Sequence, residues 1–278
     1  MNSSDLSELA QQAERHYRYY NTPSVVADYE GEQHILPVEE LLFNSYIKLG
    51  AAILDIAVGA GRTSKYLARI ASRYVGIDYA PEMLKICRNR YPQLEFWEIS
   101  AVDLSFFQDK TFDAVVISGN AIDELLTDED RRRCLLECWR VLRANGVLIF
   151  SSRTPHAILA RRTPGLIKRY RLDHIPAHSG TFSFHIGRIR NFIIAPLALA
   201  KITLEKTYLY ARKPAFWKGV GYMLDNTGLL LHYAIPRKVI GEMSQYGWQL
   251  LATQGGDYPR KTRPLATYFH YYAFSKPA

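Results

Sequence analysis

The chain has 278 residues, of which 48% are hydrophobic and 22% charged, a composition typical of a globular protein, and its net charge is +8. Three cysteines are too few for a disulfide framework, and the most hydrophobic run, residues 192–200, is too short to cross a bilayer. The first twenty residues are polar and helix-prone, unlike a signal peptide. We therefore expect a location in the reducing cytoplasm.

Residues 1–50 predict an N-terminal helical segment with helices over 4–20 and 37–48, the second beginning at Pro37. Short apolar strands then alternate with helices through residues 51–152. Strands are expected at 52–57, 74–78, 94–99, 112–118 and 147–152, and helices at 61–71, 81–90 and 127–143. This alternation predicts βαβ units, and hence a parallel sheet with helices on both faces.

The end of the chain departs from this alternation. A helix at 236–248 precedes two strand-like runs, 249–253 and 266–274, and no helix separates them, so they should pair as a hairpin. The predicted fold class is therefore α/β, a doubly wound seven-stranded sheet that is mostly parallel and has an antiparallel last strand. Residues 153–235 form an inserted basic lid subdomain, and residues 236–278 complete the core that residues 51–152 begin.

A glycine-rich turn follows the first strand in the stretch "AILDIAVGAGRTSKYLA". Gly59 and Gly61 allow a ligand to approach the backbone closely, and the helix that follows offers free N–H groups. Asp78 ends the second strand 17 residues after Gly61, where it can accept hydrogen bonds from both hydroxyls of a ribose. These features fit a dinucleotide and an S-adenosyl ligand equally well.

Asp55, just ahead of the glycines, separates the two ligands. A carboxylate close to a pyrophosphate in a partly buried site costs several kcal/mol. S-adenosylmethionine (SAM) carries no phosphate, and an acidic group can pair with its ammonium or orient the loop that holds it. Ser64 also stands where the dinucleotide motif has its third glycine. The turn therefore favours SAM.

Five segments resemble the class I SAM-dependent methyltransferases of the small-molecule type, over most of residues 15–152 and again over 236–275. "LDIAVGAGR" is similar to the first motif of this family, usually written LDLGCGTGR, and "VGIDYAPEML" is similar to its second. "FWEISAVDLSF", "FDAVVISGNAIDEL" and "LLECWRVLRANGVLIFSS" resemble the segments around the third, fourth and fifth strands.

The resemblance implies SAM as cofactor, with Asp78 on the ribose, Tyr79 and Met83 beside the adenine, and Tyr20 and Tyr29 over the methionine end. Ala57 replaces a family glycine, and we expect it to keep ordinary strand dihedrals. Ser100 replaces the family aspartate that accepts from the adenine, which weakens that contact by about 1 kcal/mol. The implied cofactor-binding residues are Tyr20, Tyr29, Asp55, Ala57, Gly59, Gly61, Asp78, Tyr79, Met83, Ser100, Ala101, Ser118 and Asn120, and no metal is implied.

The methyl acceptor should face the ends of the fourth and fifth strands. His156, Asn120 and Asp123 are the candidate catalytic residues there, although His156 also fits a loop histidine bonded to solvent. His232 either faces the cavity or packs beside the core. The arginines from Arg131 to Arg133 are expected to form a solvated face. Neither an Asn-Pro-Pro-aromatic motif nor a Pro-Cys nucleophile is present, which counts against base-modifying DNA enzymes.

The insert at 153–235 holds 13 Lys and Arg against three acidic residues, a charge of +10, so the rest of the chain carries −2. It could cap a small anionic acceptor, contact an anionic membrane as a peripheral protein, or bind RNA. It could also be a lid or a homodimer contact whose charges are merely solvated. No RNA-binding module pattern is present, so nucleic acid is an improbable partner.

The leading hypothesis is methyl transfer to an oxygen or nitrogen of a small-molecule acceptor, and acidic, sugar-linked and lipid-linked acceptors all fit it. Two alternatives stay open. One is a non-catalytic SAM-fold binding protein, and the other is an RNA methyltransferase that uses the basic insert.

Overall fold

The computed structural model of the protein describes residues 3–155, 218–225, 227–260 and 267–278. The helices are α1 (Ser3–Tyr20), α2 (Pro23–Gly31), α3 (Pro37–Tyr46), α4 (Ser64–Ile70), α5 (Pro81–Arg90), the short 3-10 helix η1 (Ala121–Glu124), α6 (Asp128–Val141) and α10 (Pro236–Gln245). The strands are β1 (Ala51–Ile56), β2 (Ala71–Asp78), β3 (Glu95–Glu98), β4 (Phe112–Ile117), β5 (Leu142–Arg153), β6 (Val220–Leu224), β7 (Leu230–Ala234), β8 (Gln249–Gly255) and β9 (Phe269–Ser275). Among these helices, none is both long enough and apolar enough to cross a bilayer.

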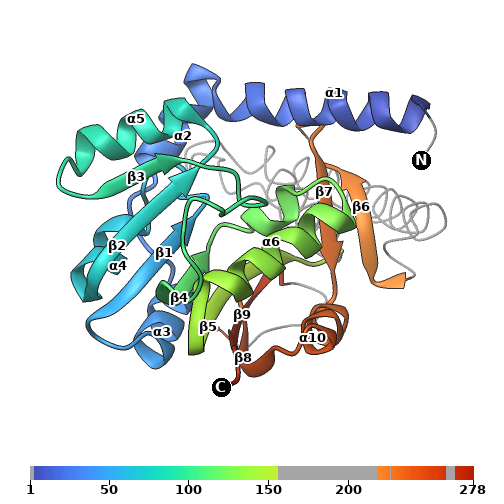
Figure 1. The fold of residues 1–278 in the computed structure, drawn as a ribbon. Coiled ribbons are helices and arrows are strands. Elements are labelled where there is room, and N and C mark those ends of the chain that lie inside the picture. Colours follow the sequence, from blue (N-terminus) through green and yellow to red (C-terminus); the bar gives the residue numbers. More distant parts are fainter. Residues whose placement is uncertain (1–2, 156–217, 226, 261–266) are drawn as a thin grey trace, which may run out of the picture.

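Seven strands form one sheet in the order β3-β2-β1-β4-β5-β9-β8 (Figure 1). The neighbouring pairs from β3 to β5 are parallel, and β9 runs antiparallel to both β5 and β8. The predicted doubly wound sheet, with its antiparallel last strand, is therefore confirmed. Because the chain order reverses on either side of β1, the carboxyl ends of β1 and β4 mark the crevice where such folds bind ligands.

The sheet buries apolar side chains on both faces. Leu54 and Ile56 of β1 belong to a core cluster that α6 and α10 cover, whereas the adjacent Ile53 joins a second cluster beneath α3, α4 and α5. This alternation is the period-two pattern of a strand buried on both sides, and every residue of β1 is buried. The two helical layers hold the strand ends in place from opposite sides.

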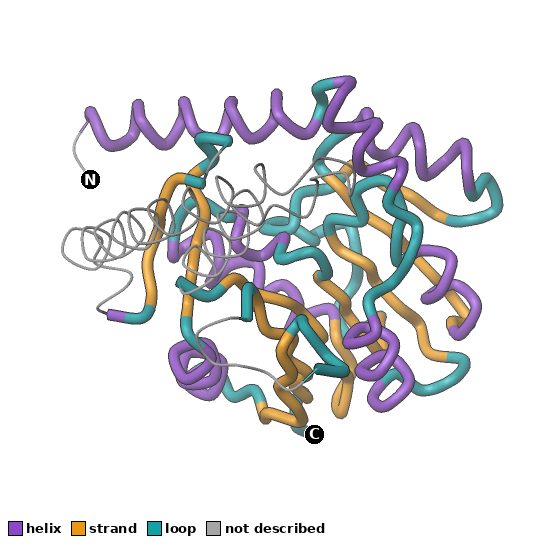
Figure 2. The backbone as a smooth tube through the Cα atoms, turned by 180° about the vertical axis from the view of Figure 1, so that it is seen from behind, coloured by secondary structure: helices purple, strands orange, loops and turns teal. Residues whose placement is uncertain are grey.

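Helix α1 lies across the carboxyl ends of the central strands (Figures 1 and 2). At one end Tyr20 packs against Met83 and its neighbours at the start of α5. Further along, Tyr19 packs against the hairpin β6–β7, and Arg15 donates to the carbonyl oxygen of Gly228 at 3.1 Å. α1 therefore connects the start of α5 with a hairpin more than 200 residues away in sequence.

Several element boundaries differ from the predictions. The helix expected from residue 61 begins at Ser64, because Gly59 and Gly61 adopt φ values of +55° and +81° and prolong the turn. Strand β5 begins at Leu142, because this residue already pairs with Phe112 ahead of the bend at Asn145. Helix α2 and the separate β6–β7 sheet were not predicted. Most of the basic insert lies outside the described residues.

Candidate active site

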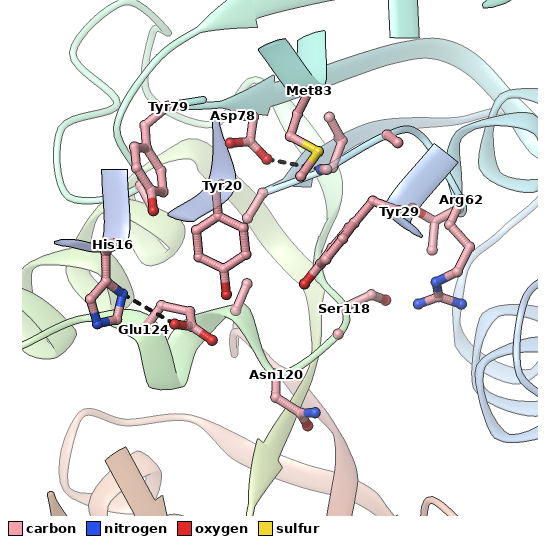
Figure 3. Close-up of a pocket in the computed structure, with 18 of the residues that line it drawn as sticks. His16, Tyr20, Tyr29, Arg62, Asp78, Tyr79, Met83, Ser118, Asn120 and Glu124 are labelled. Carbon is pink, nitrogen blue, oxygen red and sulfur yellow. Dashed lines mark hydrogen bonds and ion pairs between the residues drawn. The ribbon is translucent and has the colours of Figure 1, made fainter. Parts of the chain in front are cut away.

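A cavity of about 860 Å³ opens at the carboxyl ends of β1, β2 and β4, with residues of α1 along one side (Figure 3). The predicted cofactor residues that line it are Tyr20, Tyr29, Ala57, Gly59, Asp78, Tyr79, Met83, Ser100, Ala101, Ser118 and Asn120. Asp55, Gly61 and Asp123 do not line it. His156 lies outside the described residues, as do His174, His178 and His185 of the insert.

The glycine turn is tighter than the sequence indicated. Ala57 has φ +56°, in the left-handed region, so the expectation of ordinary strand dihedrals is wrong. Gly61 supports the turn from outside the cavity: a Cβ added there would lie 3.1 Å from the sulfur of Cys87 and would impose a side chain at φ +81°. The chain therefore accepts one alanine among the three positions of this turn, Ala57, Gly59 and Gly61, whose positive φ favours glycine.

Asp78 holds the turn against the next helix. Its Oδ2 accepts a hydrogen bond from the Gly59 N–H at 2.8 Å, and its Oδ1 accepts from the Ala80 N–H at 2.9 Å. Burial raises the pKa of Asp78, although these backbone donors oppose the shift. Each carboxylate oxygen can accept a further bond, so the group can serve both the turn and a ligand in the cavity.

Asp55 lies beneath the turn and is only 1% exposed. Its Oδ2 accepts hydrogen bonds from the Thr63 hydroxyl at 2.7 Å and the Tyr74 hydroxyl at 2.9 Å. Burial raises the pKa of Asp55 to about 7 against the effect of these two donors. Of its two anticipated roles, this geometry supports orientation of the loop, because the carboxyl group points to Thr63 at the start of α4.

Three tyrosines gather at the cofactor side of the cavity. Tyr20 packs edge to face against Tyr29 and Tyr79, with ring centroids 6.0 and 6.3 Å apart (Figure 3). Burial raises the pKa of Tyr29 to about 12 and raises the pKa values of Tyr20 and Tyr79 as well. The three phenols therefore stay protonated at neutral pH, where they offer apolar ring faces and hydroxyl donors.

Asp123 does not face an acceptor, which corrects the expectation from the sequence. It is fully buried, and its carboxylate accepts from the Ser152 hydroxyl at 2.8 Å, the Arg153 N–H at 2.5 Å and Arg131 at 3.4 Å. The His232 Nδ1 lies 3.4 Å from the same carboxylate, so His232 packs beside the core. Arg131 is 2% exposed and not solvated as predicted, because it compensates this buried charge.

A second buried ion pair lies at the opposite end of the cavity. Arg62 follows the glycine turn and makes two hydrogen bonds to Glu39 of α3, at 2.5 and 2.6 Å. Tyr271 of β9 also donates to Glu39. Glu39 is fully buried, and although burial alone would raise its pKa, the Arg62 guanidinium lowers it below the usual value. This pair joins the turn to α3 and β9 while Arg62 lines the cavity.

The sequence analysis missed His16, Glu124 and Arg62. All three side chains reach the cavity, and Figure 3 shows His16 and Glu124 facing each other. Glu124 stands next to the singled-out Asp123, but the sequence does not show which of two adjacent carboxylates turns inward. His16 belongs to a mostly exposed helix whose apolar residues Leu9, Ala13 and Tyr20 recur at helical spacing, and this stripe is the signal that could have placed His16 on the inward face. Only the position of α1 above the strand ends brings it to the site.

Comparison with known proteins identifies the domain that holds the glycine turn. Residues 54–150 match the profile of a family described as "Methyltransferase domain". The chain carries a class I, SAM-dependent methyltransferase domain. The match runs from within β1 to within β5, and so includes the glycine turn, Asp78 and the Ser118–Glu124 segment.

Two relatives by sequence are named methyltransferases. A demethylmenaquinone methyltransferase of Thermotoga maritima is 29% identical over 183 residues, which cover 63% of this chain and 77% of the relative. A ubiquinone biosynthesis O-methyltransferase of Xanthomonas oryzae pv. oryzae is 32% identical over 114 residues, 39% of this chain and 46% of the relative.

Two solved structures share the fold of this methyltransferase. The 1,6-didemethyltoxoflavin-N1-methyltransferase of Burkholderia thailandensis, solved with its acceptor and S-adenosylhomocysteine (SAH), has a TM-score of 0.58 and 11% identity, and the match covers 100% of this chain and 92% of that one. The CcbJ methyltransferase of Streptomyces caelestis has a TM-score of 0.57 and 15% identity, with 94% and 98% covered.

The described residues of the site fit the cofactor. Ser118 and Asn120 line the cavity, and the Ser118 hydroxyl and the Asn120 side-chain oxygen are buried without a hydrogen-bond partner among the described residues. Buried polar atoms normally have a partner, so these two sites are suited to a polar ligand. The turn also packs closely against the tyrosines, since a Cβ on Gly59 would lie 3.2 Å from the ring of Tyr29. Polar groups and aromatic rings thus both line the cavity, and a nucleoside with an amino-acid tail offers partners to each.

Proposed function

We propose that this methyltransferase transfers the methyl group of SAM to an oxygen or nitrogen of a small molecule bound in the same cavity. The observation that carries the proposal is the size and lining of that cavity. Its volume of about 860 Å³ is near the upper end of the roughly 300–1,000 Å³ typical of small-molecule sites, which leaves room for a cofactor and a compact acceptor. Relatives named for quinone biosynthesis act on small acceptors, which supports this class.

The cofactor would supply a methyl group on a positively charged sulfur. Asp78 would accept from the ribose hydroxyls, and Tyr79 and Met83 would flank the adenine, as the family resemblance implies. Tyr20 and Tyr29 would cover the methionine end and exclude water. Ser118 and Asn120 would then border the acceptor, so the protein acts mainly by alignment and desolvation.

Asp78 provides the test of this arrangement. Replacement by asparagine removes the charge and one strong acceptor while keeping the shape, so we expect Asp78→Asn to weaken SAM and SAH binding at least tenfold, about 1.4 kcal/mol. Isothermal titration calorimetry measures this change, and thermal unfolding checks that the variant remains folded.

Glu98→Gln is the matched control, since Glu98 is an exposed acidic residue at the end of the neighbouring strand β3 and does not line the cavity. Its affinity for SAH should equal that of the wild type. Equal affinities of the wild type and Asp78→Asn would remove Asp78 from the cofactor site, and a wild type that binds neither SAM nor SAH would favour a non-catalytic binding protein.

Three further proposals depend on the basic insert. RNA binding, contact with an anionic membrane and dimerisation through residues 153–235 all depend on a segment that is largely outside the described structure. Salt-sensitive binding of tRNA, lost when the lysines and arginines of that segment are neutralised, would favour an RNA acceptor over a small molecule. A cytoplasmic location likewise remains a prediction.

A further inference from the structure

One side of the cavity carries an imidazole and a carboxylate in contact. The Nδ1 of His16, on α1, lies 3.2 Å from Oε2 of Glu124, on η1, and the two side chains are 6% and 12% exposed (Figure 3). Neither ring nitrogen of His16 has a well-aligned hydrogen-bond partner among the described groups, and the same is true of Oε2 of Glu124. Buried polar atoms normally have a partner, so the unmatched nitrogens of this cavity-lining ring are suited to a polar ligand.

Glu124 is fixed from behind by an arginine. Its Oε1 accepts from Nη2 of Arg153 at 3.0 Å, while Nη1 of Arg153 donates to the Asn120 carbonyl oxygen at 3.0 Å. Burial lowers the pKa of Arg153, but Glu124 and Asp123 more than offset it, so the guanidinium stays charged. Arg153 therefore holds Glu124 beside Asn120 and leaves Oε2 free to face His16.

The other titratable groups around the pair are less suited to accept a proton. Of the carboxylates that line the cavity, Glu32 is exposed and Asp130 already accepts from the Thr127 hydroxyl. Tyr20 and Tyr29 have raised pKa values and remain protonated at neutral pH, as does Tyr79. Asp78 already accepts two backbone hydrogen bonds at the cofactor side. His34, which also lines the cavity, is exposed and lies by Arg62, which donates to its carbonyl oxygen. Among the described residues, His16 is the buried imidazole at this site.

We propose that His16 is the proton acceptor for the methyl acceptor, that Glu124 positions it, and that the acceptor is therefore an aromatic hydroxyl compound. This inference rests on the proposed function. Because Nδ1 of His16 faces Glu124, Nε2 is the nitrogen that takes the proton. The imidazolium so formed gains a carboxylate partner at 3.2 Å, which favours proton transfer.

The step balances as follows. The acceptor oxygen forms a bond to the methyl carbon, the bond between that carbon and sulfur breaks, and its electron pair remains on sulfur. The hydroxyl proton passes to Nε2 of His16, so the positive charge moves from the sulfur to the imidazole. A phenol loses its proton near pH 10 in water, and a positioned base makes this loss feasible at neutral pH, whereas a free amine attacks without prior deprotonation.

The first experiment measures whether the bound phenol has lost its proton. 4-Nitrophenol is titrated into the SAH-loaded wild type, and absorbance reports the ionised fraction of the bound phenol at a pH below its solution pKa. We expect the wild type to bind it mainly as phenolate and His16→Gln to bind it mainly as phenol. Equal ionised fractions in the two proteins, or no saturable binding to the loaded wild type, would overturn the proposal.

The second experiment measures methyl transfer to a panel of small phenols by mass spectrometry. His16→Gln should lower kcat/KM about 100-fold or more and Glu124→Gln about tenfold, and neither should change SAH affinity more than threefold. His270→Gln, at a half-buried histidine on β9 that does not line the cavity, should match the wild type. Retention of a third of the wild-type kcat/KM by His16→Gln would refute the role of His16, as would a comparable loss caused by His156→Gln alone. Failure of the wild type to bind SAH would instead refute the proposed function.

Discussion

Ala57 adopts a left-handed backbone conformation that costs an L-residue about 1–2 kcal/mol, whereas glycine adopts it freely. Ala57→Gly removes this strain. Glycine also has more conformational freedom in the unfolded chain, which stabilises the unfolded state by roughly 0.5–1 kcal/mol. We therefore expect the variant to be more stable by about 0.5–1 kcal/mol, measured as the midpoint of urea unfolding. Ala60→Gly is the control, since Ala60 is buried without a positive φ and its variant should lose stability. A less stable Ala57→Gly would contradict the backbone geometry.

Asp55 makes the fold sensitive to pH. Burial raises the pKa of its carboxyl group to about 7, whereas the unfolded chain ionises it near pH 3.9. Between about pH 4 and 7 the folded state thus binds more protons than the unfolded state, and the contribution of Asp55 to stability falls as pH rises.

Asp55→Asn isolates this effect, because asparagine cannot ionise. Relative to the wild type, the free energy of unfolding of the variant should increase with pH across that window, by at most about 1.4 kcal/mol per pH unit. Urea unfolding at several pH values measures the difference. Parallel stability profiles for the two proteins would show that Asp55 keeps an ordinary pKa in the folded state.

At the scale of elements, Asp123 connects four segments. Its carboxylate on η1 meets Arg131 of α6, Ser152 and Arg153 of β5, and His232 of β7. Asp123→Asn leaves Arg131 as a buried cation with little compensation, so we expect a loss of about 3 kcal/mol in unfolding free energy. Urea unfolding measures it, with Glu129→Gln as the control at an exposed ion pair with Arg132, whose loss should leave the unfolding midpoint nearly unchanged. A stable but inactive Asp123→Asn would return Asp123 to the catalytic residues.

The elements that sequence reasoning recovered are those whose signals are local. Apolar runs and the glycine turn placed the strands and helices of the core, and α6, expected from residue 127, begins at Asp128 with Thr127 as its N-cap. Helix α2 begins with a proline at Pro23, but it has no buried face that would mark it as a core helix, and distant segments complete the packing of both α2 and the β6–β7 hairpin. Arg131 looked like part of a solvated run because its partner Asp123 is brought to it only by the fold.

At the scale of the whole molecule, the cavity combines segments from both ends of the chain. Tyr20 and His16 come from α1, the glycine turn and Asp78 come from the first two strands, and Tyr271 comes from β9. The sequence motifs identified the cofactor side, because those residues follow one another in short motifs. The opposite side of the cavity depends on how α1 packs over η1, and no sequence motif predicts that packing.

The central claim is that the cavity binds an S-adenosyl ligand across the carboxyl ends of β1 and β2. A crystal structure of the protein grown with SAH and NAD together tests it most directly. The account predicts SAH in the cavity, with its ribose hydroxyls about 3 Å from the Asp78 carboxylate and its sulfur facing Ser118 and Asn120. NAD in that position, or an empty crevice closed by the surrounding side chains, would contradict it.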